Sequence, residues 1–472
     1  MAITPNGAPA AAASKQTLAS AYIDFTSTGS DSANWAQQYL PDLMEKESEI
    51  FGNRSVSGFL SQVGAEEAMQ SDQVVWSEQG RLHLSYQGDI SGETVVLDKD
   101  ADGQTVSGEC GVRAGDMVII ADANATAKCF VVSVSNVTIT VKPYQAANLA
   151  GANLSGEVQV LVFGSEYIKG VVGRDSVNTP AFKSYTNNPI IIKDKYEISG
   201  SDASQIGWVE VAGEEGQNGY LWYLKAEGDT RARFTDYLEM AMIESEKATN
   251  TTTPTQDGAT GQNLAGTEGL FAAIGARGNE ATGIVGTNAA TDLAEFDAIL
   301  AEFDKNGAIE ENMMFVNRTT ALAVDDMLAS MNSYGAGGTS YGVFDNSEDM
   351  ALNLGFSGFR RGSYDFYKSD WKYLNDISTR GLINSKDTAN AIRGVMIPAG
   401  VSSVYDQALG KNLKRPFLHV RYRASATDNR KMKTWTTGSV GAVTSDLDAM
   451  EVHYLSERCL IVQGANNFML LN

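Results

Sequence analysis

Residues 220–247 read YLWYLKAEGDTRARFTDYLEMAMIESEK, the strongest helical pattern in the chain. Apolar residues recur there at three- and four-residue spacings, which gathers them on one face of an α-helix. They are Leu221, Leu224, Phe234, Tyr237, Leu238 and Ala241. A helix of this length spans about 42 Å. Because proline cannot continue a helix, we expect the helix to end at Asn250-Thr-Thr-Thr-Pro254.

The chain before this helix is rich in expected strands. Residues 73–84 alternate apolar and polar side chains, which predicts one strand of a long hairpin. Residues 167–173 and 188–198 alternate in the same way. Between about residues 90 and 163, five short β-rich runs are separated by turn signals, at 94–97, 117–121, 130–134, 137–141 and 158–163. We therefore predict a small barrel or sandwich inserted into the host fold.

The chain after the helix mixes both element types. Residues 251–290 hold many Gly, Thr and Asn around an apolar island at 270–274, which is typical of a functional loop or interaction segment. Asp292 can cap a helix, with Glu295 completing a capping box and Asn306-Gly307 ending it. A strand at 313–316 and a helix at 319–331 follow. Further strands are expected at 364–367, 394–397, 417–423, 449–454, 459–463 and 467–471. The fold class is therefore α+β.

Composition excludes several classes of protein. The chain has 472 residues, with 36 Lys and Arg against 58 Asp and Glu, for a formal charge of -22. This balance repels phosphate backbones and argues against sequence-specific DNA contact. The three cysteines, Cys110, Cys129 and Cys459, are too few and scattered for a disulfide framework. Neither a secretion signal nor a membrane span is indicated, so we expect no membrane partner.

No catalytic residue is predicted, and the chain is not expected to be an enzyme. There is no HExxH or GxxxxGK[ST] pattern. His83, His419 and His453 each stand alone on an alternating stretch, as ordinary strand residues do. The glycine cluster at 335–342 lacks the lysine of a phosphate loop and is interpreted as a flexible loop.

One stretch matches the spacing of a calcium loop. Carboxylates stand at loop positions one, three, five and twelve, with a glycine at the sharp turn. The candidate ligands are Asp98, Asp100, Asp102, Gln104 and Glu109. The flanks read as strands, whereas an EF-hand has paired helices. A solvated hairpin turn is therefore the alternative to a Ca²⁺ site, and no cofactor is required.

Basic residues concentrate in one span of this acidic chain: Lys411, Lys414, Arg415, Arg421, Arg423, Arg430, Lys431 and Lys433. One hypothesis is a subunit interface, in which the span complements an acidic neighbouring copy. The alternative is a solvated strand face.

Five segments carry a resemblance to a known family, at residues 45–54, 76–83, 192–202, 219–225 and 234–240. They read EKESEIFGNR, WSEQGRLH, IKDKYEISGSD, GYLWYLK and FTDYLEM, and they resemble the major capsid proteins of crAss-like phages. The order of elements also resembles the Hong Kong 97-type capsid fold of tailed double-stranded DNA bacteriophages. That resemblance implies an N-terminal arm at 1–70 and an E-loop at 71–190 that carries the inserted β-domain. It further implies a P-domain at 191–290 with spine helix 220–247, an A-domain at 291–415, and a β-rich return to the P-domain at 416–472.

The resemblance also implies a function and partners. We expect a structural protein that self-assembles as hexamers and pentamers of an icosahedral head shell, which encloses genomic DNA without sequence-specific binding. Portal, auxiliary or decoration, and scaffold proteins are the implied partners. The implied location is the virion, after assembly in the host bacterial cytoplasm. No motif for the lysine-to-asparagine cross-link of some relatives is present. The alternative function is a calcium-binding, β-rich surface or adhesion module.

Overall fold

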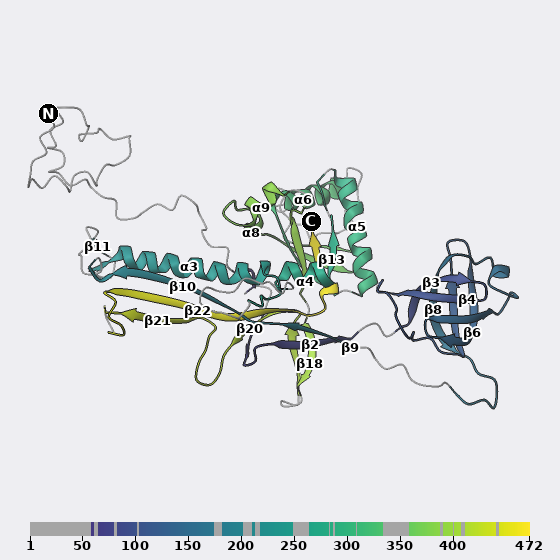
Figure 1. The fold of residues 1–472 in the computed structure, drawn as a ribbon. Coiled ribbons are helices and arrows are strands. Elements are labelled where there is room, and N and C mark those ends of the chain that lie inside the picture. The colour runs from purple at the N-terminus through teal and green to yellow at the C-terminus, as the bar shows by residue number, and fades with distance from the viewer. Residues whose placement is uncertain are drawn as a thin grey trace, which may run out of the picture. The chain divides into compact units, whose positions relative to one another are not determined.

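The computed structural model describes residues 58–60, 65–79, 83–101, 103–173, 182–201, 210–212, 218–248, 264–282, 284–286, 288–307, 309–333, 358–387, 390–399, 401–406, 411–439 and 443–472. Side chains are described at the same positions except 65, 79, 182, 210–212, 218–225, 289, 329–333, 401–406 and 411–416. The chain divides into two compact units (Figure 1). Unit 1 comprises Met1–Gly58, Lys193–Leu238 and Lys433–Leu455, and unit 2 comprises Phe59–Ile192, Glu239–Met432 and Ser456–Asn472.

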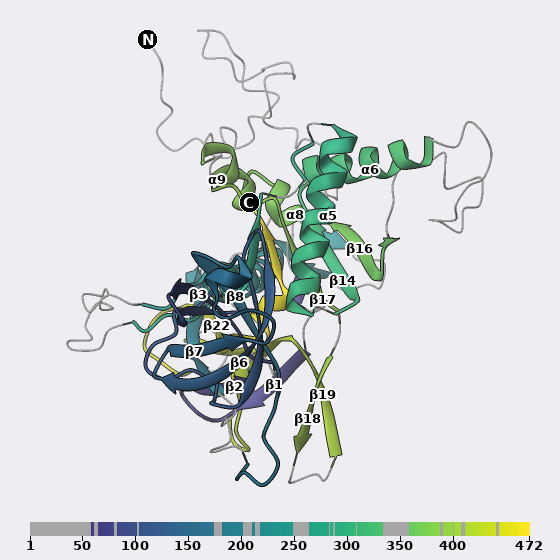
Figure 2. The same cartoon turned by 90° about the vertical axis from the view of Figure 1, so that its right-hand side faces the viewer.

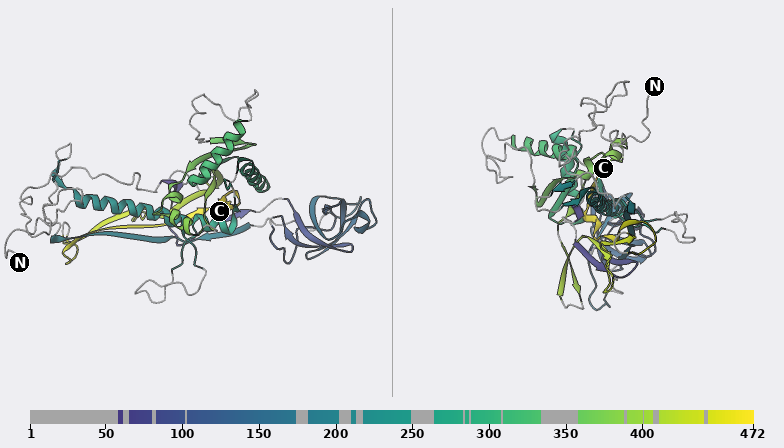
Figure 3. Two further views of the ribbon diagram at one scale, coloured as in Figure 1. Left: turned by 90° about the horizontal axis from the view of Figure 1, so that it is seen from above. Right: turned by 90° about the vertical axis from the view of Figure 1, so that its left-hand side faces the viewer.

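A closed six-stranded barrel forms part of unit 2. Its strands are β3 (Ser85–Ser91), β4 (Thr94–Asp100), β5 (Asp116–Ala121), β6 (Thr126–Ser135), β7 (Thr138–Pro143) and β8 (Glu157–Ser165). They pair in the order β3-β4-β7-β6-β5-β8 and close into a ring, drawn in blue in Figure 3. Alternate residues point inward, so that Val95, Val118, Ile120, Val141 and Val160 share one apolar core. A 3₁₀ turn, η3 (Ala150–Ala152), precedes β8.

A six-stranded mixed sheet forms the second core of unit 2. Its strands are β13 (Asn279–Ala281), β14 (Glu311–Val316), β15 (Gly358–Arg361), β16 (Tyr364–Asp370), β17 (Gly394–Pro398) and β23 (Met469–Leu471). The order is β13-β23-β17-β14-β16-β15. Helices α5 (Ala289–Asn306) and α6 (Arg318–Ser333) cover one face, as Figure 2 shows. Phe296, Val324 and Met314 bury that side together.

The opposite face of this sheet is lined by aromatic side chains. Phe315 of β14 points there, because successive residues of a strand face opposite sides. Phe59 lies between Phe315 and Trp371, with ring centroids 4.7 and 4.4 Å away.

The other named helices are α3 (Leu221–Glu244), α4 (Leu270–Arg277), α8 (Lys372–Asn375) and α9 (Arg380–Lys386), and a second 3₁₀ turn is η4 (Ala465–Asn467).

A five-stranded sheet contains β1 (Ala65–Met69), β20 (Leu418–Arg423), β22 (Ala449–Val462), β10 (Ile190–Ser199) and β21 (Lys433–Gly438). The order is β1-β20-β22-β10, and β21 also pairs with β22. Within unit 1, Phe234 of α3 packs against Tyr454 of β22 with centroids 5.7 Å apart. Lys195 and Glu451 add an ion pair of 2.9 Å between β10 and β22.

Three further pairs of strands form two-stranded ribbons: β2 (Val74–Gln79) with β9 (Phe182–Asn187), β11 (Glu210–Ala212) with β12 (Asn218–Tyr220), and β18 (Val401–Asp406) with β19 (Lys411–Pro416). The β2–β9 pairing confirms the predicted hairpin strand at 73–84 as far as Gln79. No described helix is long and apolar enough to cross a membrane.

The predicted long helix is confirmed, but it ends earlier than expected. Helix α3 stops at Glu244 and does not reach Pro254. Lys247 instead forms a β-bridge with Gly266, and the backbone N–H of Gly269 donates to the carbonyl of Ser245. These tertiary hydrogen bonds use backbone groups directly after Glu244, so the helix ends well before Pro254.

Two predictions for the following region are wrong in detail. Asn288, and not Asp292, caps α5, and its side chain accepts from the N–H groups of Ala290 and Thr291. Asp292 lies in the first turn and accepts from the N–H of Gly286. The apolar island at 270–274 is not part of a loop, because it begins helix α4. The predicted strand at 313–316, helix at 319–331 and stop at Asn306-Gly307 are confirmed.

Two strand predictions are also corrected. Residues 167–173 form no strand, since Gly170 takes a positive φ and the N–H of Val171 donates back to Ile168. Residues 449–454 and 459–463 are not separate strands, because β22 runs unbroken from Ala449 to Val462. All five strands predicted within the barrel are confirmed, and β3 is additional. Leu40, Leu43 and Ile50, which predict a short helix, and the predicted loop at 335–342 lie outside the described residues.

Candidate functional site

Arg277, at the end of α4, is held by two aromatic rings of the β2–β9 ribbon. Its guanidinium carbon lies 4.5 Å from the ring centroid of Tyr185 on β9 and 5.5 Å from that of Trp76 on β2. The cation is thus attracted to both π faces. Only 12% of the Arg277 side chain is exposed, so these contacts are made largely away from water.

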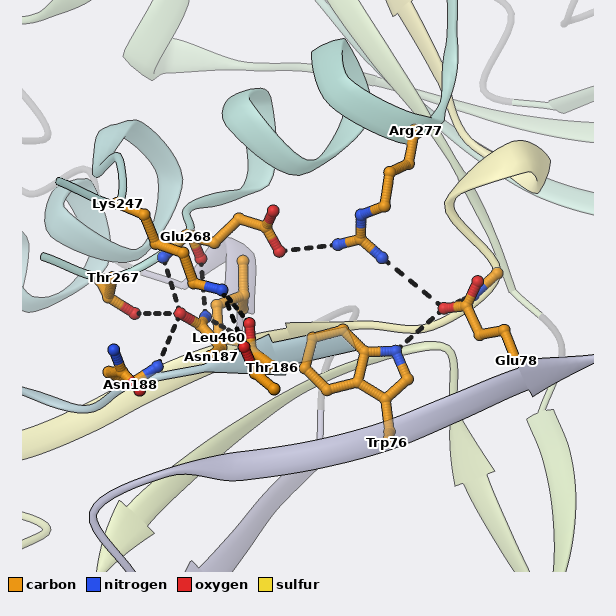
Figure 4. A network of polar contacts seen from close by, with 11 residues as sticks. Trp76, Glu78, Thr186, Asn187, Asn188, Lys247, Thr267, Glu268, Arg277 and Leu460 are labelled. Carbon is orange, nitrogen blue, oxygen red and sulfur yellow. Dashed lines mark hydrogen bonds and ion pairs between the residues drawn. The ribbon is translucent and has the colours of Figure 1, made fainter. Parts of the chain in front are cut away.

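Two carboxylates complete the surroundings of Arg277 (Figure 4). Its Nη2 donates to Glu268 Oε2 at 2.7 Å, and its Nη1 forms an ion pair with Glu78 Oε1 at 3.6 Å. The same Glu78 oxygen accepts from Trp76 Nε1 at 2.9 Å and from the N–H of Gly464 at 3.0 Å. Arg277 therefore joins the ribbon to α4, and Glu78 joins it to the turn after β22.

Asn187, at the end of β9, fixes the ribbon at a second point and is fully buried. Its Nδ2 donates to the carbonyl of Leu460 at 2.6 Å and to that of Glu268 at 3.0 Å. Its Oδ1 accepts from Thr267 Oγ1, from the N–H of Glu268 and from the N–H of Asn188. Every hydrogen-bonding position of the amide is used, so the contact is specific to asparagine. Next to it, Lys247 Nζ donates to the carbonyl of Thr186.

This network, called here the ribbon anchor, consists of Trp76, Glu78, Tyr185, Asn187, Thr267, Glu268 and Arg277. It contains no nucleophile with an adjacent base. The network has a structural role, because it holds in place the ribbon that leads into and out of the barrel. Sequence reasoning missed the anchor: its members come from three distant segments and follow no spacing rule.

The histidines are placed as the sequence predicted, with one difference. His419 is buried on β20, and His453 lies on β22 with Nε2 2.7 Å from Thr437 Oγ1 and 3.3 Å from Glu451 Oε2. Trp435 stacks on its ring at 5.1 Å. His83 is exposed and lies in a bend before the barrel, not in a strand. No two histidines meet in these contacts.

The candidate calcium loop lies at the end of β4. Asp100 Oδ1 accepts from the N–H of Gln104 at 2.8 Å, and the backbones of Asp100 and Gln104 are also hydrogen-bonded. These bonds form a hairpin turn. Asp98 and Glu109 are exposed, whereas Asp102 lies outside the described residues. Within the described part of the chain, no group of three His, Cys, Asp or Glu side chains could hold a metal. Calcium binding stays a prediction.

Four residues of the basic span form ion pairs within the chain. Arg421 contacts Glu67 at 3.1 Å, and Lys431 contacts Glu66. Glu457, which is almost fully buried, receives both Arg423 at 3.1 Å and Arg430 at 3.0 Å. Arg423 also contacts Asp72. Four cations thus meet four carboxylates, and the charge left for a neighbouring copy is smaller than the sequence indicates. Lys433 is exposed, and the side chains of Lys411, Lys414 and Arg415 lie outside the described part.

Burial shifts the pKa of one arginine and of the three cysteines. Burial lowers the pKa of Arg458, whose Nη2 donates to the carbonyl of Lys431 at 2.9 Å. Burial raises the pKa of Cys459 to about 12 and that of Cys129 to about 11. Cys110 is also buried with a raised pKa. Since the thiolate is the reactive form, all three cysteines are poor nucleophiles at neutral pH.

Comparisons with known proteins return solved structures only. No protein-family model and no curated protein matches the chain. A structure from Mycobacterium phage Ogopogo is 11% identical, covers 92% of this chain and 97% of that chain, and has a TM-score of 0.42. A capsid structure of the cyanophage P-SCSP1u is 8% identical, covers 92% of this chain and 93% of that chain, and has a TM-score of 0.41. The mature capsid of bacteriophage PhiM1 is 9% identical, covers 98% of each chain, and has a TM-score of 0.39. All three TM-scores lie below 0.5, so the likeness alone establishes neither fold nor function.

Proposed function

We propose that this chain is a structural shell subunit, the major capsid protein of a tailed double-stranded DNA bacteriophage. The observation that carries the proposal is that strongly exposed aliphatic side chains occur in three separate segments of the chain. A simple dimer needs one such surface, whereas a subunit that tiles a shell contacts several neighbours through different patches.

The first surface follows the barrel and contains Ile168, Val171 and Val172, of which Ile168 is 81% and Val172 83% exposed. The second surrounds α9, with Ile377, Leu382 and Ile383. The third is the β21–β22 connection, where Val443 is 80% and Leu447 46% exposed. Scattered single apolar residues are ordinary on protein surfaces, but clusters of this kind mark interaction sites.

The Hong Kong 97-type assignment belongs to the same proposal. We take residues 1–70 as the N-terminal arm and 71–190 as the E-loop, with β2 and β9 as its base and the barrel as its insertion. Helix α3 is the spine helix of the P-domain at 191–290. Residues 291–415 are the A-domain, and residues 416–472 return to the P-domain. The similarity to crAss-like phage proteins rests on the five sequence segments alone.

The charge and the contacts fit a structural role in the virion. A formal charge of -22 lets an inner wall enclose DNA without holding it. The ribbon anchor positions backbone and contains no catalytic group, so we propose no enzymatic activity. Copies of the same chain are the principal partners, as hexamers and pentamers assembled in the bacterial cytoplasm. Portal, decoration and scaffold proteins would join them.

Expression of the full chain followed by sedimentation velocity and negative-stain microscopy tests the proposal. We expect shells, sheets or tubes, with or without a co-expressed scaffold. A chain that stays monomeric across the accessible concentrations, with the scaffold present, contradicts it.

The alternative, a calcium-binding surface or adhesion module, is favoured by the acidic turn at Asp98 to Glu109. It predicts a small oligomer whose melting temperature rises with Ca²⁺. Calorimetry of the wild type and of the Asp98→Ala, Asp100→Ala double variant separates the two readings. A calcium-dependent rise that the double variant loses would support the site; equal melting with Ca²⁺ and with chelator in the wild type reduces the loop to a turn.

A further inference from the structure

Two polar side chains of helix α9, those of Arg380 and Asn384, face the protein. Arg380 pairs with Glu244 at the end of α3, and its guanidinium lies 5.4 Å from the ring centroid of Phe271. One turn later, Asn384 Nδ2 donates to the carbonyl of Ile392 at 2.8 Å and its Oδ1 accepts from the N–H of the same residue. These polar contacts anchor α9, whereas a surface helix ordinarily buries its apolar stripe.

The outward face of α9 is aliphatic. Leu382 is 53% and Ile383 57% exposed, and Ile377 in the preceding turn is 74% exposed. Lys386, the last residue of the helix, is exposed beside them, and the described residues offer it no carboxylate at ion-pair distance. This face, called here the α9 face, combines an apolar patch with one unpaired cation.

A second surface of unit 2 has the complementary charge. Along the outer side of α6, Leu322 is 53% exposed, and Asp326, one turn later, is exposed as well. Its neighbour Asp325 pairs with Lys368, but Asp326 has no cation at ion-pair distance among the described residues. This α6 face thus combines an apolar residue with one unpaired anion.

We propose that the α9 face of one copy docks on the α6 face of a second copy, so that Leu382 and Ile383 cover Leu322 and Lys386 pairs with Asp326. The inference rests on the proposed function and deepens it by naming one contact between subunits. The opposite unpaired charges, each beside an exposed aliphatic side chain, single out a second copy as the partner. Because the α9 face and the α6 face are different patches of the same chain, the contact is head to tail and repeats from copy to copy.

Charge reversal tests the proposed pair. Lys386→Glu places two carboxylates together and should raise the protein concentration needed for assembly about five- to thirtyfold. Asp326→Lys should do the same, and the double variant should recover most of the loss. Lys128→Glu on the barrel, also an exposed lysine, is the matched control. Far-ultraviolet circular dichroism and melting should be unchanged in all variants, because neither residue has a described partner to lose.

Cysteine cross-linking locates the contact independently. The double variant Leu322→Cys, Ile383→Cys should give a ladder of covalent multimers after oxidation of assemblies, since the three native cysteines are buried. Each single variant should give no ladder. Dimers from Ile383→Cys alone would show α9 meeting α9 and overturn the inference, as would charge reversal no stronger than Lys128→Glu. Wild type that never assembles would instead refute the proposed function, and the docking inference with it.

Discussion

Replacing Arg277 by methionine should free the β2–β9 ribbon from α4. Methionine keeps most of the apolar stem but removes the cation between Glu78 and Glu268. Removing one partner of a fully buried ion pair costs about 3–5 kcal/mol. The two carboxylates here keep 25% and 18% exposure, which lets water offset part of that cost. The lost ring contacts add about 0.5–1 kcal/mol each. We expect the local opening free energy of the ribbon to fall by about 2–4 kcal/mol.

Hydrogen exchange read by mass spectrometry measures this directly, because it follows local opening and does not require the whole chain to unfold in one step. Peptides covering Val74–Gln79 and Phe182–Asn187 should exchange about 30- to 700-fold faster, since 1.4 kcal/mol corresponds to tenfold. Peptides of the barrel strands serve as internal reference and should keep their protection.

Lys305→Met is the matched control for the charge. Its pair with Glu302 has a similar distance, 2.8 Å, but the two side chains are 70% and 41% exposed. Such a surface pair is worth less than about 1 kcal/mol. If Arg277→Met leaves ribbon protection within the range of this control, the claim that Arg277 holds the ribbon is refuted.

Three further outcomes are expected. Backbone N–H groups, that of Asn124 first, hold the pKa of Asp122 below its ordinary value of 3.8. The ionised carboxylate therefore stabilises the fold above pH 3.8, and this stabilisation is lost as the pH falls through the lower pKa of the folded state. Asp122→Asn should accordingly weaken the dependence of the barrel's melting temperature on pH between pH 5 and 2. Gly88→Ala should cost about 1–3 kcal/mol in barrel protection, since a Cβ there would overlap the carbonyl of Val96 at a β-bulge; unchanged exchange would contradict this. Asn187→Asp should destabilise the ribbon more at pH 7 than at pH 4, because a carboxylate cannot donate to the carbonyl of Leu460; equal exchange at both values would count against the buried contact.

Patterns that depend on neighbours in sequence were predictable. The apolar periodicity of residues 220–247 identifies α3, because a helix repeats its faces locally. The barrel strands are predictable for the same reason, as turn residues separate short β-rich runs. The exception is β3, which reads SYQGDIS. Its polar residues and Gly88 give no β-rich run, although Tyr86 is buried in the barrel core.

Features that depend on tertiary contacts were not predictable. The polar residues Ser456, Glu457 and Arg458 look like a break between two strands. Glu457 and Arg458 are nevertheless buried within β22, because Glu457 contacts Arg423 and Arg430 and Arg458 donates to a carbonyl. The ribbon anchor is a similar case, since no sequence pattern near Arg277 predicts its contacts with Trp76 and Tyr185. The calcium spacing is a local pattern of another kind: its residues Asp100 and Gln104 form a hairpin turn, and calcium binding stays a prediction.

The first and last strands of the barrel are neighbours in its ring: β3 and β8 run antiparallel, with Ser85 opposite Leu161. The chain therefore enters and leaves the barrel at adjacent points, and the flanking strands β2 and β9 can pair as if a short turn joined them. The barrel can be lost, exchanged or enlarged without a change in the register of the β2–β9 pair. The strand pairing of the rest of the fold would therefore stay the same when the barrel changes.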